Sequence, residues 1–127
     1  MKNLILNQKF FYRLYQKLIR KDKNEYDFIK YVFKKYKNKN IKLLDICCGD
    51  SHILNYIKPY LSNYLGIDNN QNYLKNSKKK YKKFDFIDAN IEQIQNLKII
   101  KKTKINFIFL NGAIHHLNNK TVKKHIF

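Results

Sequence analysis

Apolar positions along this chain follow two spacings, and each spacing predicts a different kind of element. Residues 10–19 and 29–36 carry apolar side chains three or four positions apart, which predicts two amphipathic helices. Denser apolar runs predict four buried strands, at 41–46, 64–68, 84–87 and 105–110. Helical spacing returns at 51–58, 70–81 and 91–97, and again from 122 onward. The chain should therefore begin with helices and then alternate strands with helices.

This alternation is typical of an α/β fold with a parallel sheet and helices on both faces. A chain of 127 residues has room for one such unit. We expect helices over 1–40 and the α/β unit, with about four strands, over 41–127. Strand ends that precede helices then share one edge of the sheet, which is where ligands bind in these folds.

Three aspartates fall at the ends of three successive predicted strands, although the chain has only nine acidic residues. They are Asp45, Asp68 and Asp88. Asp68 lies 19 residues beyond Gly49, close to the spacing at which an acid in such folds reaches the hydroxyls of a ribose. Each aspartate alone is equally compatible with a helix cap or a turn. Their shared position at strand ends favours a nucleoside-type ligand.

Four segments together resemble the successive motifs of class I S-adenosylmethionine-dependent methyltransferases. They read LLDICCGDS, GIDNNQNYL, FDFIDANIEQI and INFIFLNGAIHHL, and the resemblance covers about residues 26–127. It implies a Rossmann-like fold and S-adenosylmethionine as cofactor. The sheet of that family has seven strands, so the resemblance also implies a form that is truncated after the fourth strand.

The first motif of that family is an acid followed by alternating glycines. Asp45 and Gly49 match it, whereas Cys47 and Ser51 occupy the places of the first and last glycines. The resemblance implies that Asp45 orients the loop and the amino group of the cofactor, and that Gly49 gives backbone access. The Ser51 hydroxyl is expected to cap the next helix or to crowd the methionine part of the cofactor.

The later motifs imply the remaining contacts. By the resemblance, Asp68 binds both ribose hydroxyls and Asn69 lies beside the adenine. Asp88 accepts a hydrogen bond from the adenine amine, and Ala89 lies against the ring. Asn111 forms the floor nearest the sulfonium. An activated methyl sulfonium needs little more from the protein than to be held in line with the acceptor.

His115 and His116 follow the fourth predicted strand and are candidates for a catalytic base or a substrate contact, although a structural role fits them equally well. The pair lacks a third ligand at metal-binding spacing, so no metal site is expected. Cys47 and its neighbour Cys48 lack disulfide or zinc spacing, and we interpret them as reduced thiols of a turn rather than as nucleophiles.

The net charge of +18 raises the possibility of a nucleic-acid partner. Of the 27 basic residues, however, all but Arg13 and Arg20 are lysine, and a compositional bias of the coding sequence would give the same result. Recognition of phosphates and bases favours arginine. No apolar stretch approaches the roughly 20 residues of a membrane span, and we expect a cytoplasmic protein.

Several functions remain open beside methyl transfer to a small-molecule, lipid or sugar acceptor. A nicotinamide dehydrogenase would need two glycines at G-x-G spacing, which the chain lacks. Amino-methylation of adenine or cytosine is disfavoured because the fourth motif reads NGAI instead of Asn or Asp, two prolines and an aromatic residue. RNA binding, RNA methylation and an inactive fragment are the alternatives. The apolar run 105–110 would form an exposed sheet edge that a second chain could complete.

Overall fold

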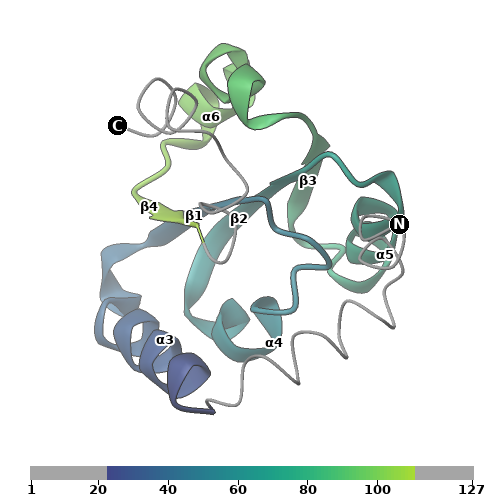
Figure 1. Cartoon of the computed structure of the whole chain (residues 1–127). Coiled ribbons are helices and arrows are strands. Elements are labelled where there is room, and N and C mark those ends of the chain that lie inside the picture. The colour runs from purple at the N-terminus through teal and green to yellow at the C-terminus, as the bar shows by residue number, and fades with distance from the viewer. Residues whose placement is uncertain (1–22, 111–127) are drawn as a thin grey trace.

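A computed structural model of the chain describes residues 23–110, with side chains from Tyr26 onward (Figure 1). Helices and strands alternate through most of this range. In chain order they are α3 (Lys23–Lys35), η1 (Lys37–Lys39), β1 (Ile41–Ile46), α4 (Leu54–Ile57), η2 (Lys58–Tyr60), β2 (Leu61–Asp68), α5 (Gln71–Lys80), β3 (Asp85–Asp88), η3 (Ile91–Asn96), α6 (Lys98–Thr103) and β4 (Phe107–Phe109), where η marks a 3-10 helix.

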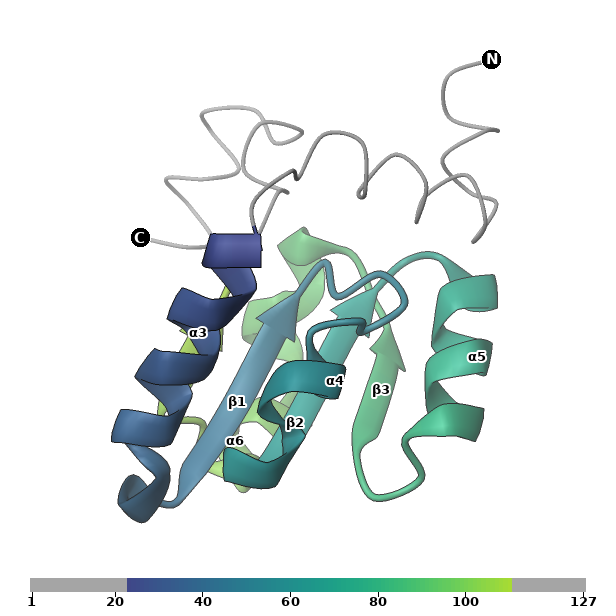
Figure 2. The same cartoon turned by 90° about the horizontal axis from the view of Figure 1, so that it is seen from below.

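The four strands form one parallel sheet in the order β3-β2-β1-β4. The carboxyl ends of the first three strands lie close in register, because Ile46 pairs with Ile67 and Asp68 pairs with Asp88. Figure 2 shows these three strands pointing in the same direction, with the turns that follow them gathered at one edge. The predicted α/β fold, with a parallel sheet of about four strands, is confirmed.

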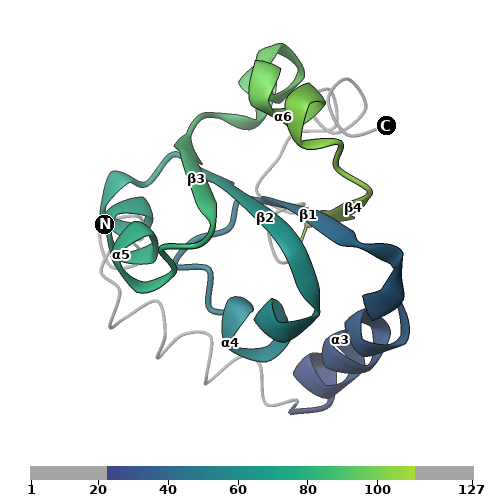
Figure 3. The same cartoon turned by 180° about the vertical axis from the view of Figure 1, so that it is seen from behind.

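Both faces of the sheet are covered, and the alternation of side chains along the strands divides the core in two (Figures 1 and 3). Leu43 belongs to the cluster that includes residues of α3, α4 and α5. Its neighbour Leu44 belongs to the cluster on the other face, with residues of η3 and α6. Because successive strand residues point to opposite faces, one apolar run serves both layers.

Helix α3 confirms the predicted apolar face only in part. Ile29 and Phe33 are buried, at 8% and 5% exposure. Tyr36 was expected on the same face, but the helix ends at Lys35 and Tyr36 is 39% exposed. Its ring still contacts Phe107 of β4, with the centroids 5.9 Å apart. The helix therefore packs through its middle, and its last residues reach the edge of the sheet.

The remaining elements differ from prediction mainly at their ends. The α-helix expected from 51 covers only Leu54–Ile57 and continues as η2, which contains Pro59. The stretch 91–97 forms a 3-10 helix, and α6 after it was not predicted. The helices expected at 10–19 and after 122 lie outside the described residues, and the division at residue 40 stays a prediction. None of the helices in residues 23–110 has the length and apolar character to cross a membrane.

Candidate functional site

The turn after β1 alternates between ordinary and left-handed backbone. Cys47, Gly49 and Ser51 have φ angles of 59°, 56° and 55°. Left-handed backbone costs a residue with a side chain roughly 1–2 kcal/mol, whereas glycine adopts it freely. This conformation explains why the motif that the turn resembles has glycines at these three places. Here Cys47 and Ser51 adopt it with side chains present.

A buried hydrogen-bond network holds this turn from below. The Tyr64 hydroxyl of β2 donates to Asp45 Oδ2 over 2.6 Å, and a second hydrogen bond of 3.1 Å joins it to Ser51 Oγ. Tyr64 and Ser51 are fully buried and Asp45 is 3% exposed. The expectation that the Ser51 hydroxyl caps the next helix is wrong, because α4 has no side-chain cap and this hydroxyl points to Tyr64. The network ties both ends of the turn to β2.

Burial governs the protonation of this network. It raises the pKa of Asp45 from 3.8 to about 7; the Tyr64 hydrogen bond opposes the rise, and the charge of Asp68 adds to it. Burial and the Asp45 charge likewise raise the pKa of Tyr64 well above its usual value. Tyr64 is therefore a neutral donor at physiological pH, and Asp45 titrates near neutrality.

A second anchor holds the turn from the strand edge. Asp68 Oδ2 accepts a 2.8 Å hydrogen bond from the Gly49 N–H, and Asp68 Oδ1 accepts one of the same length from the Asn70 N–H. An ionised carboxylate has about four acceptor positions, so each oxygen keeps one for a ligand. Asp68 is only half-buried. The acceptor position that remains on each oxygen thus fits the pair of hydroxyls on a ribose.

The rim beside Asp68 is polar and accessible. Asp88 is exposed, and its Oδ2 accepts a 3.0 Å hydrogen bond from Gln71 Nε2. Asn69 is also exposed, and its Nδ2 donates to Asn90 Oδ1 over 3.1 Å. The N–H of the buried Ala89 donates to the Asp68 carbonyl, which joins the two strand ends. A small apolar residue flanked by amide and carboxylate groups suits a nucleobase.

The two cysteines differ in environment. Cys47 is exposed at the turn, whereas Cys48 is half-buried and its N–H donates to the Ile67 carbonyl. Desolvation of the Cys47 sulfur and the charges of Asp68, Asp45 and Glu92 raise its pKa to about 11. Burial also raises the pKa of Cys48. Neither thiol is ionised at neutral pH, which agrees with their interpretation as turn residues.

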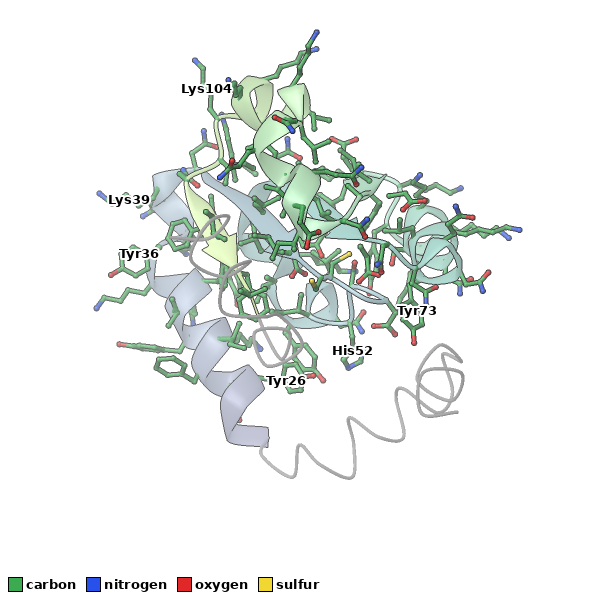
Figure 4. The ribbon with its side chains drawn as sticks, turned by 45° about the horizontal axis from the view of Figure 1, so that its top comes forward. Tyr26, Tyr36, Lys39, His52, Tyr73 and Lys104 are labelled. Carbon is green, nitrogen blue, oxygen red and sulfur yellow. The ribbon has the colours of Figure 1, made fainter. Side chains whose placement is uncertain are left out.

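An aromatic cluster joins α3 to the segment that follows the turn. Tyr26 stacks on Tyr56 with centroids 4.4 Å apart, and the half-buried His52 ring meets both edge to face. His52 also contacts Asn55, whose side chain accepts from Tyr81. Figure 4 shows Tyr26 and His52 close together. The half-buried His52 is thus part of the packing between α3 and this segment.

The site thus brings most of the predicted residues to one edge of the sheet. Asp45, Asp68 and Asp88 all lie at or next to the carboxyl ends of adjacent parallel strands. Three residues of this edge were not predicted from the sequence: Tyr64, Gln71 and Asn90. Tyr64 was missed because a tyrosine in a strand is usually a core residue. Asn90 had a signal, the Gln93 three residues later that completes a capping box. Asn111, Gly112, His115 and His116 lie outside the described residues.

A comparison with models of known protein families identifies the family of the chain. A family model described as a methyltransferase domain matches residues 37–123, more than half of the chain. No curated protein gives a significant match.

Several solved structures are similar to the chain. The sugar N-methyltransferase KedS8 from Streptoalloteichus sp ATCC 53650 is 18% identical, with a TM-score of 0.49, over 63% of this chain and 33% of that one. The plantazolicin methyltransferase BpumL in complex with S-adenosylhomocysteine (SAH) is 23% identical, with a TM-score of 0.47, over 69% of this chain and 39% of that one. The methyltransferase domain of bacterial CtHen1-C is 17% identical, with a TM-score of 0.42, over 78% of this chain and 55% of that one.

The chain spans 33% to 39% of the length of the first two of these proteins. Its family match includes the turn after β1 and the ends of β2 and β3, where the candidate site lies. The chain therefore belongs to the family of class I S-adenosylmethionine-dependent methyltransferase domains.

Proposed function

We propose that the edge formed by the turn 47–51 and the ends of β2 and β3 binds S-adenosylmethionine, and that the domain transfers its methyl group to a small-molecule, lipid or sugar acceptor. The observation that carries the proposal is the position of Asp68. Its carboxylate lies between the Gly49 and Asn70 amides and keeps an acceptor position on each oxygen. A ribose with two adjacent hydroxyls matches that pair.

The chain's own residues would divide the binding of the cofactor among them. Asp68 would accept from the ribose hydroxyls, and Asp88 with Asn69 would hold the edge of the adenine. Ala89 would lie against the ring. Asp45 would fix the turn, because its carboxylate is bound to Tyr64 beneath it. The cofactor supplies an activated methyl group, so the chain's contribution to the reaction is mainly orientation.

The acceptor side of the proposal rests on the sequence. The fourth motif reads NGAI and lacks the prolines and aromatic residue of enzymes that methylate the amino groups of bases. We further propose that a second chain completes the sheet beside β4. In the described sheet β4 pairs with β1 alone, and its Ile108 is 65% exposed, so this edge offers both backbone groups and apolar surface.

Calorimetric titration with SAH tests the cofactor site. Asp68→Asn keeps the size of the side chain but removes its charge and one acceptor, and we expect binding at least ten times weaker, as for the loss of hydrogen bonds to a charged group. Asp88→Asn should weaken binding less, because Asp88 is exposed.

Asp85→Asn is the matched control, because Asp85 is also exposed and lies at the opposite end of the same strand. It should leave the affinity for SAH unchanged. Circular dichroism of each variant shows whether it is folded. Absence of SAH binding by folded wild-type protein would refute the proposal, as would equal losses in the Asp85 and Asp68 variants.

A further inference from the structure

Exposed lysines precede every strand of the sheet. These residues lie in the segments that lead into the amino ends of the strands, opposite to the candidate cofactor site. They are Lys37 and Lys39 before β1, Lys58 before β2, Lys82 and Lys83 before β3, and Lys104 before β4. We call this set of six lysines the amino-end face.

The topology adds the lysines of the helix ends to the same region. In a parallel α/β fold each connecting helix runs opposite to the strands, so that it ends near their amino ends. Figure 2 shows α3 and α5 ending there. The last turns of α3, α5 and α6 carry Lys34 and Lys35, Lys78, Lys79 and Lys80, and Lys101 and Lys102.

The acids have the opposite distribution. Five of the seven acidic side chains in residues 26–110 lie at or just after the carboxyl ends of β1, β2 and β3: Asp45, Asp50, Asp68, Asp88 and Glu92. Of the other two, Asp27 lies in α3 and Asp85 lies at the start of β3. The domain therefore has an acidic end that holds the candidate cofactor site and a strongly basic end facing the other way.

Neither simple explanation accounts for this segregation. A compositional bias toward lysine raises the number of lysines but does not choose their positions. Attraction to the helix dipole favours lysine in the last turn of a helix, by about 0.3–1 kcal/mol each. It explains Lys78, Lys101 or Lys58, which caps α4, but not Lys82 or Lys83, which lie in the connection between α5 and β3.

We propose that the amino-end face binds double-helical nucleic acid through its phosphates. A duplex carries one negative charge per roughly 1.7 Å of its axis, and lysines that neutralise phosphates release condensed counterions. The described residues contain no arginine, so the contacts would be point charges without the bidentate geometry that reads bases. Binding should therefore depend little on sequence.

The aromatic residues of this region favour a duplex over a single strand. Single strands bind by stacking their bases on exposed aromatic rings. Tyr81 and Phe84 flank Lys82 and Lys83, but they are only 5% and 9% exposed. Lys83 Nζ instead lies 5.9 Å from the centre of the Phe84 ring, which holds the lysine stem at the surface. Tyr36, before η1, is the more exposed ring at 39%, but it already contacts Phe107 and Lys35. The face therefore offers much charge and little surface for stacking.

The proposal does not depend on the cofactor site. The two surfaces lie at opposite ends of the strands, so the duplex and a nucleoside ligand can be bound at the same time. In Figure 4 Lys39 and Lys104 both lie on the side of the view opposite to His52 and Tyr73. The affinity for a duplex should then be the same with and without saturating SAH.

Fluorescence anisotropy with a labelled duplex of mixed sequence tests the proposal on the full chain. The first variant replaces Lys39, Lys83 and Lys104 with glutamine. The matched control replaces Lys30, Lys75 and Lys98, which are also exposed but lie at the middle of α3, the middle of α5 and the start of α6. Both variants lose the same charge, so a difference between them reports position.

The first variant should bind at least ten times more weakly than wild type and lower the slope of log affinity against log salt by nearly three, about one for each lysine. The control should stay within about threefold of wild type at salt above roughly 100 mM, where distant charges are screened. Equal losses in the two variants would show an effect of net charge and overturn the proposal. Tighter binding to single strands or to anionic phosphatidylserine vesicles than to the duplex would also overturn it.

Discussion

The hydroxyl of Tyr64 donates a 2.6 Å hydrogen bond to Asp45, and neither side chain is more than 3% exposed. This contact places a carboxyl group in the core directly beneath the turn that we propose to bind the cofactor. Cys48, Ser51 and the charge of Asp68 surround the pair. Because the cost of burial exceeds the gain from the hydrogen bond, the pKa of Asp45 is raised to about 7.

The stability of the domain should therefore fall as pH rises toward neutrality. Asp45 has a pKa of 3.8 when unfolded and about 7 when folded, so between these values the folded state binds the extra proton. Its contribution is fully present below about pH 4 and is lost by about pH 7, by up to roughly 4 kcal/mol at 1.4 kcal/mol per pKa unit. Urea unfolding at a series of pH values measures it.

Asp45→Asn is the control for this dependence, because asparagine cannot titrate. The free energy of unfolding of wild type, minus that of Asp45→Asn, should fall as pH rises from 4 to 7 and stay constant above that range. A difference that does not change with pH would show that Asp45 keeps its ordinary pKa.

Tyr64→Phe should destabilise the domain most when Asp45 is ionised. The substitution keeps the ring and removes the donor, and a buried acceptor left without a partner costs about 1–3 kcal/mol, more if it is charged. We expect the loss in free energy of unfolding to be larger at pH 8 than at pH 4. Because the hydrogen bond lowers the pKa of Asp45, its removal should also shift the pH dependence of stability to higher pH. Tyr60→Phe, at a half-buried ring before β2, is the comparison. An equal loss at both pH values would contradict the expectation.

The fold was predictable because strand and helix periods are properties of short segments. The run 41–46 coincides with β1, and the helical spacing over 70–81 matches α5, in which Tyr73 and Leu74 are buried. A parallel sheet then brings the strand ends together whatever the details of the loops. The positions of Asp68 and Asp88 at one edge therefore followed from the pattern alone.

The network beneath the turn was not predictable, because it depends on register between strands. Tyr64 reaches Asp45 and Ser51 only because β2 lies beside β1 with Tyr64 paired to Leu43. A serine just before a predicted helix reads as a helix cap, and nothing in the local sequence shows that the Ser51 hydroxyl points into the core. The extra helix α6 was missed because its six residues, KIIKKT, are too few for a helical period to appear.

Gly66 should not tolerate alanine. A Cβ at this position would lie 2.9 Å from Cys48 Sγ, 2.9 Å from Phe86 Cδ1 and 3.0 Å from Tyr64 Cε1. Crowding of this kind in a packed core costs about 1–3 kcal/mol. We expect Gly66→Ala to lower the free energy of unfolding by that amount. In a Cys48→Ala background the same substitution should cost less, because one of the three neighbours is gone. Equal costs in both backgrounds would show that Cys48 is not part of the contact.

Cys47→Gly should stabilise the domain. Cys47 has a φ of 59° and is exposed, so glycine relieves left-handed strain of roughly 1–2 kcal/mol and removes little packing. Glycine also increases the entropy of the unfolded chain, which offsets about 0.5–1 kcal/mol of that gain. The expected net change is a gain of up to about 1.5 kcal/mol in the free energy of unfolding, measured with urea. Cys48→Gly is the matched control, because the neighbouring residue has ordinary backbone and packs against the core, so glycine should destabilise there. Destabilisation by both substitutions would mean that the Cys47 side chain makes contacts that outweigh its strained backbone.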